Sequence, residues 1–378
     1  MHKISASVSK RSVRSAQILL FLFLLNSAHS EPILRNSLKA DTVAKKRSGI
    51  IFIPAIFYTP ETKLAGGASM MYYFRSSESS EISRPSTISP TFIYTQRKQI
   101  ISLLFADLYW QQETYHFTGG FSYFNFPDKF YGIGASTPES LEEDFTPRTI
   151  SFLANMQKKI QRALYIGILY EFANSKIIEV EEDGLLAGVD ILGSEGGTVS
   201  GAGFYTNWDT RNTIFTPATG SYHQFSATFF KRAFGSDYDF NRYNLDLRTY
   251  FPVRASHVLA FQAYFNFISG DAPFQMLSKI GGQYLMRGYY DGRYRDKNLV
   301  VMQTEYRLPI WRRFGLVGFA GLGEVASKIN HFEIDKLKYS IGWGVRYLFS
   351  RNEGLNIRMD FGYGENSSGF YITLGEAF

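Results

Sequence analysis

The chain has 378 residues, with 40 Lys and Arg against 34 Asp and Glu, 17% aromatic residues and no cysteine. Without cysteine there is no disulfide framework, so stability must come from an extended hydrogen-bonded architecture. The small charge excess does not indicate nucleic-acid binding. No run of about 18 apolar residues follows residue 30, which excludes a helical membrane protein. What remains is a large soluble β protein or a transmembrane barrel.

Residues 1–30 have the three-part pattern of a secretory signal. A basic start with four Lys and Arg residues precedes an apolar run over residues 16–25, and Ala28-His29-Ser30 forms a small-x-small cleavage site. The alternative is a membrane anchor, but about ten apolar residues cannot cross a hydrocarbon core that needs roughly 20 in a helix. Removing the four basic residues leaves 36 Lys and Arg against 34 acidic residues, a net charge of +2. We therefore expect an exported chain.

Alternating segments of about ten residues, punctuated by Gly and turn residues, predict about sixteen strands, an even number as in bacterial barrels. In chain order the predicted strands are residues 50–58, 64–75, 86–96, 98–110, 113–124, 148–160, 162–174, 198–209, 220–231, 238–251, 257–269, 297–308, 313–326, 336–349, 353–363 and 368–378. Strands of a soluble sandwich are shorter, about 5 to 6 residues. The length favours strands that cross a bilayer at a tilt.

Apolar and polar faces separate cleanly along several of these strands. One strand sets Tyr243, Leu245 and Leu247 against Arg242, Asn244, Asp246 and Arg248, and later strands repeat the pattern with Phe261, Phe265 and Trp343 on the apolar face. In a transmembrane barrel the apolar face meets lipid and the polar face lines the lumen. Aromatic residues at the strand ends fit the girdles of such a barrel. The fold expected is an all-β, closed, antiparallel transmembrane β-barrel.

Connector lengths assign the two ends of the barrel, because periplasmic turns are short and external loops long. Residues 159–162, 252–256 and 309–312 are short, whereas 125–147, 175–197 and 270–296 are long. Both termini are then periplasmic. The connector 76–85 is the exception, since it is long on the predicted periplasmic side.

The segment from Gly281 to Gly323 contains an Arg-Gly-aromatic tip, Arg287-Gly288-Tyr289, followed by a strand that carries Glu305. Gln303, Glu305 and Arg307 share one face of that strand, which places Glu305 in the lumen. This arrangement resembles the bacterial surface antigen superfamily, the BamA/TamA-like outer-membrane barrels. The match is strongest over residues 209–378, and the turn built from Asp209-Thr210-Arg211-Asn212, Pro217 and Gly220 resembles the family's turn between strands eight and nine.

The resemblance implies that the loop between strands 11 and 12 folds into the barrel, where Arg287 pairs with acids on strands 12 and 13. Arg287, Gly288, Tyr289 and Glu305 form this predicted loop lock. The strand-13 motif departs from the family's Phe-x-Asp-x-Gly, because here it reads Phe319-Ala320-Gly321-Leu322-Gly323. Glu324 has the wrong parity to replace the missing acid, so we expect a weaker or differently anchored loop. The alternative is that Arg287 and Glu305 only tune ion selectivity, as lumenal charges do in porins.

The last predicted strand places Phe370, Ile372, Leu374 and Phe378 on one face. A terminal aromatic in this position resembles the signal that hands outer-membrane barrels to their assembly machinery, so Phe378 is predicted to carry that signal. The resemblance also implies a seam between the first and last strands that opens laterally. Pro54 in the first strand and Gly375 in the last are consistent with a weak seam.

Neither an enzyme nor a cofactor-binding or metal-binding protein is expected. After residue 30 the His residues His116, His223, His257 and His331 are scattered singly, without metal-ligand spacing and without a repeating nucleophile or base cluster. We assign them to girdles or loops. The glycine pairs lack the Lys and helix context of phosphate sites.

The expected organisation is a signal peptide over 1–30, a periplasmic linker over 31–49 and the barrel over 50–378. Residues 31–49 are too few for the polypeptide-transport-associated domains that the family usually carries. The resemblance implies an outer-membrane protein that acts in insertion or translocation of outer-membrane proteins, or as an accessory barrel in such a complex. Its partners would be outer-membrane lipid and unfolded outer-membrane polypeptides or other assembly components, and no nucleic acid. The alternative is a passive channel or structural porin-like barrel.

Overall fold

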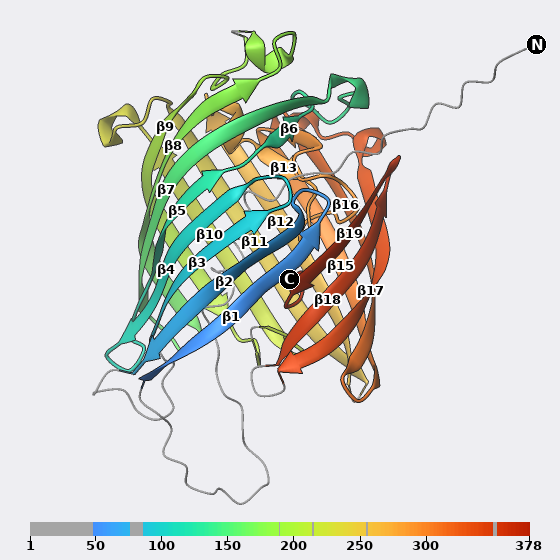
Figure 1. The fold of residues 1–378 in the computed structure, drawn as a ribbon. Coiled ribbons are helices and arrows are strands. Elements are labelled where there is room, and N and C mark those ends of the chain that lie inside the picture. The colour runs from blue at the N-terminus through green and yellow to red at the C-terminus, as the bar shows by residue number, and fades with distance from the viewer. Residues whose placement is uncertain (1–47, 76–85, 189, 214, 255, 351–353) are drawn as a thin grey trace, which may run out of the picture.

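The structure is a computed structural model that describes residues 48–75, 86–188, 190–213, 215–254, 256–350 and 354–378. The predicted signal peptide, almost all of the linker and the connector 76–85 lie outside the described residues. Sixteen described strands form one closed antiparallel β-barrel (Figure 1). They are β1 (Ser48–Thr59), β2 (Lys63–Phe74), β3 (Ser86–Thr95), β4 (Ile100–Trp110), β5 (Tyr115–Asn125), β7 (Glu143–Lys159), β8 (Leu164–Val180), β9 (Gly196–Asp209), β10 (Gly220–Phe230), β11 (Phe240–Arg254), β12 (His257–Gly270), β15 (Asn298–Trp311), β16 (Phe314–Ala326), β17 (Lys338–Ser350), β18 (Leu355–Gly364) and β19 (Ser367–Leu374).

Three shorter strands lie outside this count. β6 (Asp128–Phe130) continues the line of β5 along β7, and β13 (Ser278–Ile280) pairs with β14 (Tyr294–Asp296) inside a long loop. Six single-turn helices complete the described elements: η1 (Glu139–Leu141), η2 (Leu185–Ala187), η3 (Arg232–Phe234), η4 (Phe274–Met276), η5 (Ile329–His331) and η6 (Ile334–Lys336). No helix among the described residues is long and apolar enough to cross a membrane.

Each of the sixteen strands predicted from the sequence overlaps one strand of the barrel. The largest differences are at β7 and β8, which run several residues further than expected at the end of the barrel that carries the long loops. We call this the loop end. Phe130, Phe145, Phe230 and Phe274 pack together at that end, and this apolar cluster supports the extended ladder. The connectors 160–163 and 312–313 are short and the loops 181–195 and 271–297 are long, as the sequence predicts.

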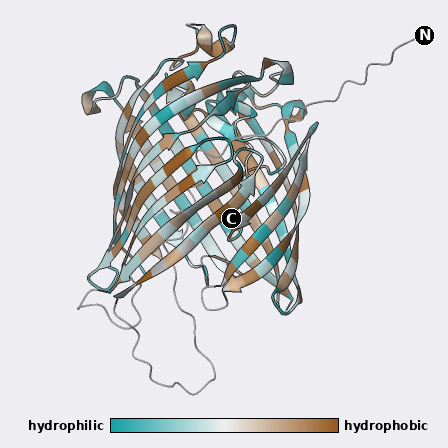
Figure 2. Ribbon diagram, viewed as in Figure 1, coloured by the Kyte–Doolittle hydropathy of each residue, from teal (hydrophilic) through white to brown (hydrophobic). Residues whose placement is uncertain are grey.

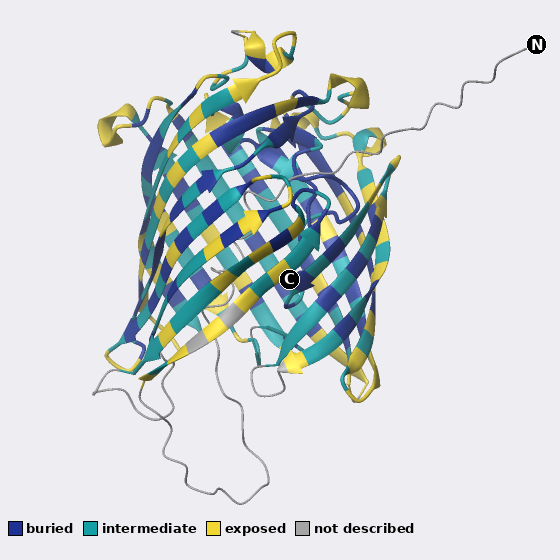
Figure 3. Ribbon diagram, in the orientation of Figure 1, coloured by how far each residue is buried: buried dark blue, intermediate teal, exposed yellow. Residues whose placement is uncertain are grey.

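Apolar side chains cover the outside of the barrel and polar side chains line the inside. Phe204 is 63% exposed, Phe261 43% and Trp343 48%. Asp246 and Glu305, at inward-facing positions of other strands, are almost fully buried. The strands alternate hydrophobic and hydrophilic colour along their length (Figure 2), and exposure alternates with it (Figure 3). A soluble fold would have the opposite arrangement, so hydrocarbon is the environment that suits this exterior.

The seam between β1 and β19 is the weakest part of the ladder. β1 and β2 pair from Ser48↔Phe74 to Thr59↔Lys63, but among the described residues β1 and β19 share the single rung Tyr58↔Ile372. The barrel is closed mainly at the loop end of this seam, where the Tyr58 and Phe370 rings lie 5.7 Å apart. Within the described part of the chain, most of β1 therefore has a partner strand only on the side of β2.

The prediction that the last strand continues to Phe378, with Phe370, Ile372 and Leu374 on the same face, is wrong. β19 ends at Leu374, Gly375 takes a left-handed φ of 78°, and Phe378 is 4% exposed inside the barrel. Phe378 packs with Tyr250, Val258 and Tyr284. A positive φ is accessible to glycine at little cost, and it turns the chain away from β1 and into the lumen.

A charged residue at the lipid face should distinguish the two faces of the wall. Phe225 lies midway along β10 and points outward, while the next residue, Ser226, lines the lumenal cavity. We expect Phe225→Arg to lower the free energy of unfolding in a bilayer by about 2–4 kcal/mol. Ser226→Arg is the matched control and should cost much less. Urea unfolding in lipid vesicles measures both, and equal losses would contradict the assignment of the faces.

Candidate functional site: the infolded loop and its lumenal arginines

The loop between β12 and β15, residues 271–297, folds back into the barrel. It carries η4 and the β13–β14 hairpin, and most of its residues are buried (Figure 3). The tip runs through Met286, Arg287 and Gly288, where Met286 has a φ of 58° and Gly288 a φ of 112°. These left-handed conformations turn the chain sharply, so the Arg287 side chain projects into the barrel wall rather than toward solvent.

Arg287 is the centre of the site, with 1% of its side chain exposed. Nη2 lies 2.5 Å from Glu305 Oε1 on β15, and Nη1 lies 2.5 Å from Asp360 Oδ2 on β18. Its guanidinium also stacks on Phe319 of β16, with 3.6 Å between Cζ and the ring centroid. A buried guanidinium is costly unless carboxylates meet it, and two carboxylates and an aromatic face do so here.

Gly288 and Tyr289 hold the tip on the last strands. A Cβ at Gly288 would lie 2.7 Å from the Tyr363 backbone nitrogen, so only glycine allows this close approach to β18. Tyr371 accepts a hydrogen bond from the Gly288 amide at 3.0 Å. The Tyr289 hydroxyl donates to the Tyr339 carbonyl and accepts from the Glu365 amide.

The motif Phe319-Ala320-Gly321-Leu322-Gly323, predicted on the thirteenth strand, lies on β16. Its glycines leave room for the loop, and no carboxylate stands there. A Cβ at Gly321 would lie 3.1 Å from Met286 Sδ, and one at Gly323 would lie 3.4 Å from Met286 Cγ. The Met286 thioether thus occupies the space that a side chain on β16 would need. The second carboxylate comes from Asp360 on β18, two strands beyond β16. Glu324 is not involved, because it accepts a hydrogen bond from the Glu333 amide instead.

Three further arginines surround the two carboxylates. Arg307 lies 2.9 Å from Glu305, Arg346 lies 2.5 Å from Asp360, and Arg358 lies 3.5 Å from Asp360. Beyond these pairs, Arg346 reaches Glu376 at 2.7 Å, Arg358 donates to Thr373, and Arg307 donates to the carbonyl oxygens of Pro217 and Phe378. The lumen at this level is one connected ionic network, which we call the arginine network (Arg287, Arg307, Arg346, Arg358 with Glu305, Asp360, Glu376).

Of the residues singled out from the sequence, the structure brings together Arg287, Gly288, Tyr289, Glu305, Phe319 and Gly321, and it places Phe378 at the edge of the arginine network. Sequence reasoning missed Asp360, Arg346 and Tyr371. The alternation of β18 assigns Asp360 to the lumen, but nothing in the sequence says that it reaches Arg287. His116 also differs from its expected girdle role, because it pairs with Asp107 inside the barrel and stacks on Tyr109.

A cavity of about 450 Å³ lies between the loop and the opposite wall of the barrel. Its lining includes Asn155, Glu171, Asn244 and Arg242 from the strands and Gln275 and Tyr284 from the loop. The loop therefore fills one side of the lumen and leaves, on the other, a space lined by both polar and apolar side chains. Among the described residues, no group of His, Asp and Glu could hold a metal ion.

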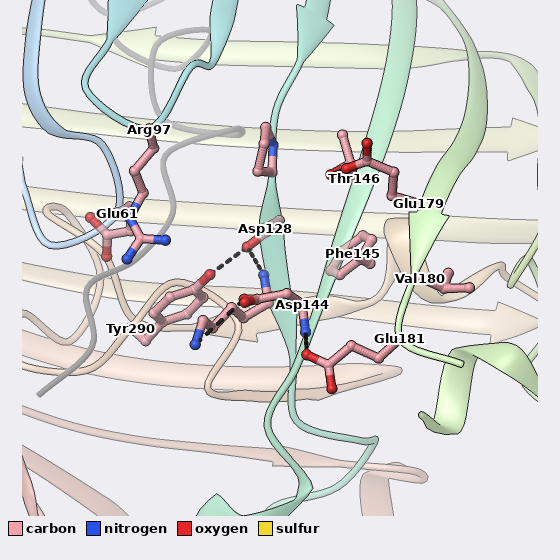
Figure 4. Close-up of a pocket in the computed structure, with 12 residues that line it drawn as sticks. Glu61, Arg97, Asp128, Asp144, Phe145, Thr146, Glu179, Val180, Glu181 and Tyr290 are labelled. Atoms are coloured by element: carbon pink, nitrogen blue, oxygen red, sulfur yellow. Dashed lines mark hydrogen bonds and ion pairs between the residues drawn. The ribbon is translucent and has the colours of Figure 1, made fainter. Parts of the chain in front are cut away.

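A second cavity, of about 300 Å³, opens at the loop end of the barrel (Figure 4). Tyr290 of the infolded loop donates to Asp128 at 2.6 Å, and the Asp144 amide donates to Glu181 at 2.7 Å. Glu61, in the turn between β1 and β2, also lines this cavity and is fully buried. Burial raises the pKa of Glu61 well above its ordinary value, and the nearby charges of Asp291 and Asp128 add to this shift. Glu61 therefore keeps its proton in the folded state at a pH where an exposed carboxyl has lost it.

A membrane-type barrel with an infolded loop held by a buried arginine is a BamA-like architecture. Residues 84–378 match the Omp85 superfamily domain, and the chain belongs to this superfamily. No curated protein matches the sequence significantly.

Solved structures similar to this chain share its fold at low identity. BamA from Haemophilus ducreyi lacking POTRA domains 1–3 superposes with a TM-score of 0.61 at 12% identity, over 95% of this chain and 78% of that one. CdiB from Escherichia coli gives a TM-score of 0.57 at 8% identity, over 93% of this chain and 69% of that one. CdiB from Acinetobacter baumannii gives a TM-score of 0.54 at 12% identity, over 87% of this chain and 59% of that one.

Removing the arginine at the loop tip should be far more costly than removing a lumenal arginine elsewhere. Arg287→Gln leaves Glu305 and Asp360 facing each other's charge in a buried site, and we expect a loss of about 3–5 kcal/mol in the free energy of unfolding. Arg242→Gln is the matched control, since Arg242 pairs with Glu171 in a partly exposed part of the lumen. Urea unfolding together with limited proteolysis of the loop measures both effects. Equal stability of the two variants would contradict the buried network.

The stability of the protein should depend on Glu61 in a defined direction. Between the ordinary carboxyl pKa and the raised one, the unfolded chain ionises while the folded chain keeps the proton, so stability falls as pH rises. We expect Glu61→Gln to remove this contribution to the loss of stability with rising pH. The variant should be more stable than the wild type at neutral pH. Unfolding midpoints from about pH 4 to about pH 8 test this. Asp183→Asn, at an exposed loop carboxylate, is the control, and identical pH profiles for Glu61→Gln and wild type would refute the assignment.

Proposed function

We propose that this protein is an outer-membrane barrel that acts in the insertion or translocation of outer-membrane polypeptides, by itself or as an accessory barrel in an assembly complex. Export by the signal at residues 1–30 and placement in the outer membrane are part of this proposal. Membership of a superfamily of insertion and translocation barrels supports it. The observation that carries it is the seam between β1 and β19.

The edge of β1 can accept another strand. Beyond the rung Tyr58↔Ile372, no described strand pairs with the edge of β1 that faces away from β2. In hydrocarbon every unpaired backbone group costs several kcal/mol, roughly, so such an edge favours pairing with an extended polypeptide. Pro54 removes one backbone donor from β1, which is consistent with a weakly paired first strand. A client strand could then pair with the edge and leave it again.

The infolded loop also supports a role in insertion or translocation, because it fills part of the lumen that an open channel would leave free. Arg287, Gly288, Tyr289 and Glu305 would act as the lock of this loop, with Asp360 as the second acid. In the nascent chain, before the barrel closes, Phe378 would serve as the assembly signal. In the finished barrel it lies inside.

The lumenal cavity favours a second candidate, a passive channel for small solutes. Planar-bilayer recording separates the two functions. Steady ion-selective conductance that is unaffected by Arg287→Ala supports the channel. Negligible or flickering conductance that rises with Arg287→Ala supports a barrel plugged by its loop.

Locking the seam should abolish the proposed activity. The chain has no cysteine, so Tyr58→Cys with Ile372→Cys introduces one disulfide across the seam rung. In cells depleted of the native protein, we expect a set of outer-membrane proteins to be lost, wild type to restore them, and the oxidised variant to fail until it is reduced. Thr206→Cys with Phe225→Cys bridges a rung of β9 and β10 away from the seam and is the matched control.

Two results count against this proposal. An outer-membrane proteome that does not change on depletion would remove the insertion role. Full restoration by the completely cross-linked seam variant would show that insertion does not require β1 and β19 to separate.

A further inference from the structure

The tip of the infolded loop binds one rung of the last hairpin, which is β18 and β19. Asp360 and Tyr371 stand opposite each other in that pairing. Asp360 holds the Arg287 guanidinium, and the Tyr371 hydroxyl accepts from the Gly288 amide and donates to the Tyr289 carbonyl. Three adjacent loop residues are thus fixed by both strands of the hairpin at the same level.

The backbones of the loop and the hairpin are also in direct contact. A Cβ at Gly362 would lie 2.6 Å from the Arg287 carbonyl carbon, and one at Gly288 would meet the same stretch of β18. Ser367, the first residue of β19, donates to the Gly288 carbonyl at 2.7 Å. The loop therefore packs against the inner surface of the hairpin from its turn to its middle.

The remaining contacts of β19 show how its position is determined. On the side of β18 it pairs from Ile357↔Leu374 to Gly364↔Ser367, but on the side of β1 it has one rung among the described residues. From the lumen, Arg358 donates to Thr373 and Arg346 binds Glu376. Both arginines also contact Asp360. The strand that forms one side of the seam is thus held by β18 and by the loop and its arginines much more than by β1.

We propose that the infolded loop positions the last hairpin and so sets the width of the seam, with Asp360 and Tyr371 as the positioning residues. A second acid on β16 would fasten the loop to a strand three places from the seam. The same charge on β18 fastens it to the strand that carries β19. Release of the loop tip therefore releases the seam strand, and a client that displaces β19 must also break the contacts of the tip.

This inference concerns the seam on which the proposed function rests, but its test measures the seam itself and no insertion activity. It can fail while polypeptide insertion stands, and it can hold in a barrel that inserts nothing.

The seam can be measured by disulfide formation. In the Tyr58→Cys, Ile372→Cys background, the rate of cross-linking by a mild oxidant in native outer membranes reports how often the two strands are in register. We expect Asp360→Asn, Arg287→Gln and Tyr371→Phe each to lower this rate severalfold. Tyr371→Phe removes only one hydroxyl and is the most conservative of the three changes. Arg242→Gln, on the opposite wall, should leave the rate unchanged, and the Thr206→Cys, Phe225→Cys pair controls for general loosening.

Moving the charge separates anchoring of the loop from positioning of the hairpin. In Gly321→Asp with Asp360→Asn, Arg287 can pair with an acid on β16, and Met286 can shift its flexible side chain to make room. We expect protection of the loop from protease to recover while seam cross-linking stays low. Recovery of both would show that any anchor of the loop suffices. Unchanged cross-linking in Asp360→Asn and Tyr371→Phe, with the loop accessible to protease, would overturn the inference.

Discussion

The structure depends on one buried guanidinium. Arg287 lies on a loop that has left bulk water, and its charge is tolerated because Glu305 and Asp360 bind its two terminal nitrogens while Phe319 covers its face. Removing either carboxylate leaves positive charge less well compensated in a site that water barely reaches. The loop conformation, the glycines that allow its approach and the polarity of the surrounding strands all follow from this requirement.

The arginine network extends this constraint from the loop to the barrel. Glu305 and Asp360 belong to strands on either side of β16 and β17, so the ion pairs bridge a sector of the wall that ladder hydrogen bonds alone would hold. Arg346 and Arg307 carry the connection to Glu376 and Phe378, after the last strand. As a result, a barrel with an almost unpaired seam is braced from inside.

Two sets of interactions compete for residues 375–378 at that seam. In the lumen these residues make an ion pair, a carbonyl contact and contacts in an apolar cluster, whereas beside β1 they would form backbone hydrogen bonds in hydrocarbon. In the structure the lumenal contacts prevail, with Gly375 providing the turn. The free edge of β1 is the consequence, and it is also the feature that makes a strand-accepting function reasonable for this protein.

The sequence by itself determined the strand count, the alternation of the faces and which connectors are short or long, because strand periodicity and turn residues are local properties. It also placed Arg287 at a loop tip and Glu305 in the lumen, since parity follows from position within one strand. Only the tertiary structure decided that Asp360 replaces the acid missing at Gly321, and that Phe378 turns inward. Both depend on which strands curve round to face the loop when the cylinder closes, and this long-range geometry leaves no local pattern in the sequence.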